Sequence, residues 1–62
     1  MSVLRKAAEE QIEEILMEAS AIGFRNQLID IAKVIMEMNP TIRKVDAYEL
    51  AYQEILFEND LD

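Results

Sequence analysis

The side chains with the clearest potential for chemistry are the carboxylates of the run Glu9-Glu10-Gln11-Ile12-Glu13-Glu14. Carboxylate oxygens are ligands that Mg²⁺ prefers. Residues three and four apart lie on one face of a helix, so Glu10, Glu13 and Glu14 could hold such an ion together. The competing interpretation is an acidic helix face that simply contacts water.

The spacing Glu9-Glu10-x-x-Glu13 resembles the EExxE helix of all-α nucleotide pyrophosphohydrolases. The resemblance implies a Mg²⁺-dependent nucleotide hydrolase. Members of that family add an ExxD pair on a following helix, and no Glu of this chain has Asp three residues later. We therefore predict a solvated acidic face and keep hydrolysis as a distant alternative.

Other catalytic and metal sites lack the residues they need. The chain has no His and no Cys, which argues against structural zinc, di-iron ExxH sites and Cys or His nucleophilic chemistry. Ser2 and Ser20 have no obvious base, and Lys33 is predicted to pair with Asp30 or Glu37. The sequence predicts a protein that is not an enzyme and has no cofactor.

The charge balance argues against two classes of partner. Thirteen acidic and six basic residues give a net charge of −7. Phosphate contacts need clustered Lys and Arg, so neither nucleic acid nor an anionic membrane surface is an expected partner. The apolar runs are too short for a transmembrane helix or a secretion signal, and we expect a soluble, intracellular, cytoplasmic protein.

The stretch 24–38 has the strongest helical pattern. Polar side chains recur at Asn26, Asp30, Lys33 and Glu37, which form one narrow stripe at about 100° per residue. The remaining circumference is apolar, so this helix, predicted over 25–38, must be covered on more than one side.

A second helix is predicted over residues 2–22, with an apolar seam from Ala8 to Ile22. If one helix ran through both stretches, this seam would run straight into the polar stripe. A break at Gly23, in the left-handed conformation found after helix ends, resolves the conflict as a helical hairpin. A long continuous helix with different partners for its two halves is the alternative.

The last helix is predicted over 46–58. Pro40 disfavours helix at Asn39, and residues 40–45 then form a connection. Asp46 as N-cap and Glu49 would form a capping box, with Val45 and Leu50 in the staple positions. An earlier start would place Arg43 and Lys44 at the positive end of the helix dipole.

The predicted fold is all-α: one domain over residues 1–62, with a helical hairpin plus a third helix. A chain of this size is marginally stable alone, and without disulfides or zinc the remaining remedy is association. We expect a homo-oligomer, most simply a dimer, that completes the core.

An exposed apolar line on the last helix is the main candidate interface. Tyr48, Tyr52 and Ile55 would face the core, which leaves the line of Leu50, Phe57 and Leu61 uncovered. Ile29 and Met36 on the flank of the middle helix complete the predicted interface.

The sequence therefore predicts a small acidic protein-interaction module: an adaptor, regulator or assembly factor of the kind common among phage and mobile-element accessory proteins. Its partners would be a second copy and another protein. The alternative is an acidic inhibitor that imitates nucleic-acid charge on a host enzyme.

Overall fold

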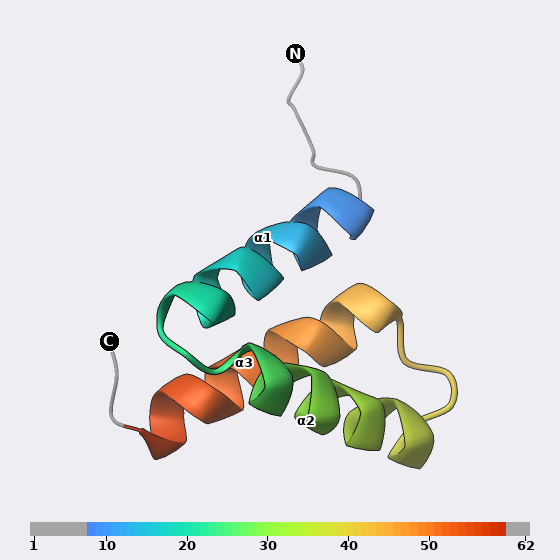
Figure 1. Cartoon of the computed structure of the whole chain (residues 1–62). Coiled ribbons are helices and arrows are strands. Elements are labelled where there is room, and N and C mark those ends of the chain that lie inside the picture. The colour runs from blue at the N-terminus through green and yellow to red at the C-terminus, as the bar shows by residue number, and fades with distance from the viewer. Residues whose placement is uncertain (1–7, 60–62) are drawn as a thin grey trace.

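The computed structural model describes residues 8–59, which form three α-helices joined by two short connections (Figure 1). The helices are α1 (Ala8–Ala21), α2 (Arg25–Met38) and α3 (Lys44–Glu58). The predicted all-α class is confirmed, and the bounds predicted for the middle helix coincide with those of α2. The predicted start of the first helix, residues 2–7, lies outside the described residues.

Gly23 ends α1, as the sequence predicts. Its φ is +85°, in the left-handed region that residues with a side chain rarely adopt. The Gly23 amide donates to the Ser20 carbonyl at 3.1 Å and the Phe24 amide to the Ala19 carbonyl at 2.8 Å. These are the two hydrogen bonds of a Schellman motif, and Phe24 also packs against the core cluster that contains Ala19.

Asn39 ends α2 directly before Pro40, again as predicted. Its backbone amide donates to the Ile35 carbonyl at 2.9 Å. Its side-chain amide donates to the same carbonyl at 3.3 Å. A carbonyl that would otherwise lack a helical partner at this end is thereby satisfied.

The predicted start of the third helix is wrong. α3 begins at Lys44, and Arg43 is the extended residue before it, because the Ala47 amide already donates to the Arg43 carbonyl at 3.0 Å. Asp46 is therefore inside the first turn and cannot form the expected capping box. Its carboxylate instead accepts from the Arg43 guanidinium, at 2.9 Å from Nε and 3.3 Å from Nη2. This pairing offsets the unfavourable charge that argued against an early start.

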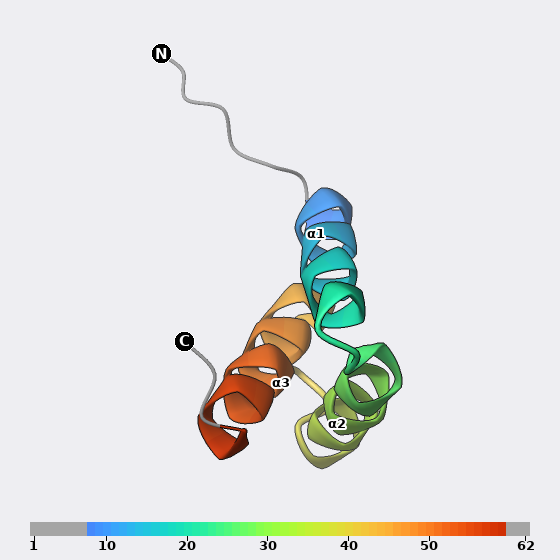
Figure 2. The same ribbon diagram turned by 60° about the vertical axis from the view of Figure 1, so that its left-hand side comes forward.

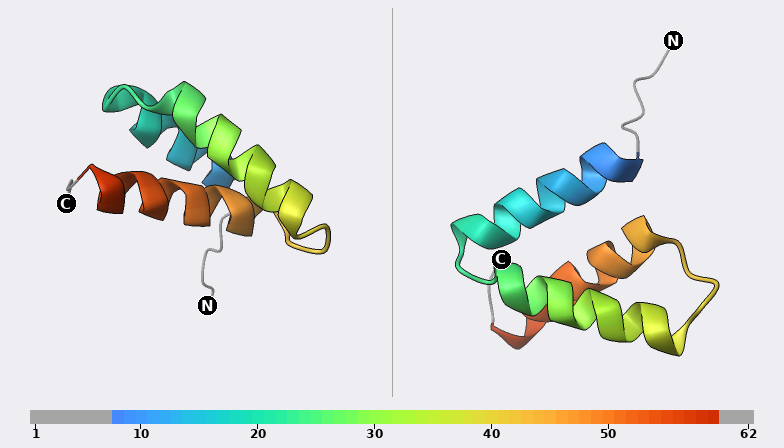
Figure 3. Two further views of the ribbon diagram at one scale, coloured as in Figure 1. Left: turned by 90° about the horizontal axis from the view of Figure 1, so that it is seen from below. Right: turned by 45° about the vertical axis from the view of Figure 1, so that its right-hand side comes forward.

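α3 is the element that holds the other two together. It contacts α2 most extensively and α1 next, whereas α1 and α2 contact each other least. In Figures 1 and 3, α1 and α3 run in the same general direction and α2 runs back against both. Figure 2 shows α1, α2 and α3 at the three corners of a triangle, with α1 and α2 joined by the short connection between them.

The core is small and depends on alanines for close packing. Six buried residues have no exposed surface and come from all three helices: Ala19, Leu28, Ala32, Ala47, Ala51 and Ile55. Side chains as short as alanine let the helix backbones approach closely. The larger side chains of Leu28 and Ile55 fill the space that remains between the helices. Tyr48 is buried in the same cluster, which places it in the core as predicted.

One polar contact joins α1 to α3 at the edge of this core. The Gln11 side-chain amide donates to the Glu49 carboxylate, and both side chains are partly buried. Glu49 therefore serves an interhelical contact instead of the cap predicted for it. No helix within residues 8–59 has both the length and the apolar character that a membrane span requires.

We expect Gly23→Ala to lower the free energy of unfolding by about 1 kcal/mol, because an L side chain is strained in the left-handed region. Nothing lies within 4 Å of the added Cβ, so backbone strain is the only cost. Gly23→Asn, the matched control, should lose less because Asn tolerates this conformation. Urea unfolding followed by circular dichroism measures both, and an alanine variant as stable as the parent would contradict the turn.

Candidate interaction surface

Leu50 and Phe57 lie on the side of α3 that neither α1 nor α2 covers. Leu50 is 50% exposed and Phe57 is 87% exposed. They are seven residues apart, which places them two turns apart on one face of the helix. Leu61, the third member of the predicted line, lies outside the described residues. Exposure is what the sequence predicts for these side chains, and their role as an interface stays a prediction.

Ile29 and Met36, the predicted interface residues on the middle helix, are only partly exposed. Both pack against the core cluster within the chain, as does Ile35. The opposite flank of α2 is the open one: Val34 is 52% exposed and Met38 is 74% exposed. The flank with Val34 and Met38 is therefore more exposed than the flank with Ile29 and Met36. The interface role of Ile29 and Met36 stays a prediction.

Val34 and Met38 line an apolar groove between α2 and α3. Its lining residues are Asp30, Ile31, Val34, Ile35, Met38 and Glu54, and its volume is about 410 Å³. The four apolar members come from one helix, and the α3 member is a carboxylate. Sequence reasoning missed this groove, although the i, i+4 spacing of Val34 and Met38 shows that both lie on one face.

The groove and the exposed line of α3 adjoin each other. Glu54 lines the groove, Leu50 precedes it by four residues and Phe57 follows it by three. Such neighbours lie on one helix face, so Leu50 and Phe57 stand one turn to either side of the groove's α3 wall. We call Leu50 and Phe57 the α3 ridge, and the cavity beside it the α2–α3 groove.

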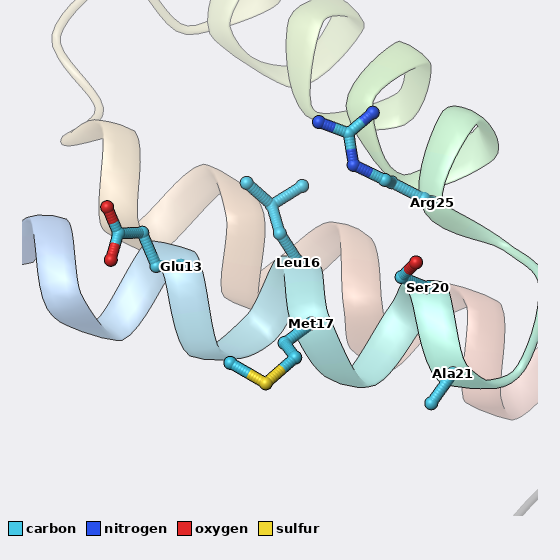
Figure 4. Close-up of a pocket in the computed structure, with 6 residues that line it drawn as sticks. All are labelled: Glu13, Leu16, Met17, Ser20, Ala21 and Arg25. Atoms are coloured by element: carbon cyan, nitrogen blue, oxygen red, sulfur yellow. The ribbon is translucent and has the colours of Figure 1, made fainter.

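A second depression lies where α1 meets the start of α2 (Figure 4). It is lined by Glu13, Leu16, Met17, Ser20, Ala21 and Arg25. Figure 4 shows Leu16 and Arg25 directed to one side of α1 and Met17 to the other. Its polar groups do not converge, so the depression is a shallow saddle without a defined ligand position.

The acidic run of α1 faces outward. Glu9, Glu10, Glu13 and Glu14 are all exposed, as is Glu18 one turn later. Within residues 8–59, no three acidic side chains come together in a way that could hold a metal ion. These glutamates form an exposed acidic face.

Tyr52 connects α3 to α1 at the border of this face. Burial raises the pKa of its phenol above the ordinary 10.0, and the negative charge of Glu18 and a hydrogen bond with its carboxylate raise the pKa further. At the other end of α3, Asp46 raises the pKa of the exposed Arg43 through their hydrogen bonds and opposite charges. Neither group is placed like a catalytic acid or base.

Comparison with protein-family models, with curated proteins and with solved structures finds no match to this chain.

The pKa shift of Tyr52 predicts a loss of stability at alkaline pH. The folded chain favours the neutral phenol, so its contribution is complete below pH 10.0 and is lost as the pH rises through the higher folded pKa. Absorbance of tyrosinate gives the folded pKa, with Tyr52→Phe to assign the signal. Glu18→Gln should lower that pKa, and an unchanged titration would contradict the contact.

Proposed function

We propose that this chain is a small, non-enzymatic interaction module, an adaptor or assembly factor, that forms a homodimer through the α3 ridge. The observation that supports this proposal is the exposure of Phe57, a large aromatic side chain, on the same helix face as Leu50. Large apolar side chains that are exposed on an isolated domain usually mark a surface that a partner covers. Aromatic residues are also the type most enriched at the centre of interfaces.

A twofold dimer would use the ridge twice, because the same patch contributes from both copies. Fully burying four exposed Leu or Phe side chains would yield roughly 6–12 kcal/mol, and the ridge gains less than this because Leu50 is already half covered. Association itself costs an estimated 4–15 kcal/mol or more. The balance predicts a weak, concentration-dependent dimer, as suits a module that exchanges partners.

Leu50→Asp and Phe57→Asp should each shift the chain to the monomer, since a buried unpaired carboxylate is strongly unfavourable in an interface. Met17→Asp is the matched control, because Met17 is an exposed apolar residue of α1 at 69% exposure, on a different helix from the ridge. Light scattering across protein concentration measures the mass, and melting across the same range measures linked stability.

A parent chain that stays monomeric at every concentration would contradict the dimer. So would ridge variants that retain the parent's mass. Loss of assembly in Met17→Asp as well would place the interface away from the ridge. Circular dichroism of each variant establishes that the helices persist.

The exposed glutamates of α1 favour one second candidate: an inhibitor that presents phosphate-like charge to a nucleic-acid-binding enzyme. Charge imitation should weaken steeply above physiological ionic strength, about 0.15 M, where charges are screened within about 8 Å. The dimer should behave in the opposite way, because salt screens the repulsion between two chains of charge −7. Sedimentation across salt concentration tests the dimer. Self-association that weakens with added salt argues against apolar packing of the ridge.

A further inference from the structure

We infer that the α2–α3 groove binds a basic amphipathic helix of a partner protein, which rests on the proposed function as an interaction module. The floor of the groove is apolar. Ile31, Val34, Ile35 and Met38 supply it from α2 alone. Their spacing of i, i+3, i+4 and i+7 places them on one helix face about 10 Å long at 1.5 Å per residue.

A floor of this length accommodates two turns of a partner helix. Amphipathic helices dock in apolar grooves through anchors at i, i+3 or i+4, and i+7, which span the same distance. Met38 is the most exposed of the four floor residues, and a flexible methionine adapts its shape to an incoming side chain.

The charge at the rim selects a basic partner. Asp30 stands on the α2 side and Glu54 on the α3 side, and no cation is among the lining residues. Glu58, which is exposed, follows Glu54 by one helical turn. Lys or Arg residues flanking the apolar anchors of a docked helix would thus meet carboxylates on both walls.

The described Lys and Arg side chains of this chain lie outside the groove. Within residues 8–59, Arg43 pairs with Asp46, and Arg25 and Lys44 line other cavities. Lys33 belongs to the polar stripe of α2, away from the apolar floor. No described helix of a second copy carries clustered cations, so a second copy does not supply the basic helix that Asp30 and Glu54 favour in this groove.

The test uses a fluorescent helical peptide of about 14 residues, or four turns, with Leu at the anchor positions and Lys elsewhere. Fluorescence anisotropy at about 0.15 M salt follows its binding to the full chain. Val34→Ala with Met38→Ala should weaken binding by about tenfold or more, since the floor loses its contact area. Both residues are exposed and alanine favours helix, so the fold should persist.

Asp30→Asn with Glu54→Gln tests the rim and should also weaken binding. Glu9→Gln with Glu10→Gln is the matched control, because it removes the same charge from exposed positions of α1. Equal losses in the two pairs would reduce the binding to general charge attraction and overturn the groove. A scrambled peptide of the same composition that binds equally well would also overturn it, as would no binding at all.

Failure of this inference is distinguishable from failure of the dimer. If the peptide does not bind but Leu50→Asp still changes the mass, the groove assignment falls and the dimer stands. If the floor variants abolish self-association while the ridge variants leave it intact, a second copy occupies the groove, and the basic helix is overturned.

Discussion

The packing of α3 against two other helices at once is the constraint on which the whole structure depends. Ala51 and Ile55 on this helix have no exposed surface, and Val45 and Tyr48 are buried with them. α1 and α2 have few contacts with each other, so each takes its position chiefly from α3. The Gly23 turn fixes where the two helices separate, and the side chains of α3 determine how far apart they lie.

The same constraint creates the candidate interaction surface. α3 has apolar residues around nearly all of its circumference, and two neighbours cannot cover a full circle. Leu50 and Phe57 lie on the part of the α3 surface that these neighbours do not cover. The groove lies beside it, between α2 and Glu54 of α3. The apolar surface of α3 is larger than the area that α1 and α2 can cover. The covered part forms the core, and the uncovered part forms the candidate interaction surface.

Charged groups contribute little to the folding of this protein, and the proposed choice of partner rests on them. The Arg43–Asp46 pair is exposed, and pairs of this kind add little stability. The carboxylates instead cover the outer face of α1 and the rim of the groove. Carboxylates in these positions repel acidic surfaces and attract basic ones, and they leave the apolar positions free for contact.

Local signals in the sequence determined the helical class, the bounds of α2, the break at Gly23 and the stop before Pro40. Each depends on interactions within a few residues: periodicity, a left-handed glycine or the steric effect of proline. Periodicity also predicted which residues share the acidic face of α1 and which share the α3 ridge. The angle of a side chain around its own helix axis does not depend on neighbouring helices.

Tertiary structure alone decided which helix is central and which flank of α2 remains open. The sequence pattern indicated that the helix within residues 24–38 must be covered on more than one side, but α3 is the helix with the most contacts to the other two. It also decided the start of α3, where the contact between Arg43 and Asp46 replaced the expected cap. Periodicity gives the direction of a side chain, whereas cover depends on where other helices lie, and that is fixed only when all the side chains pack together.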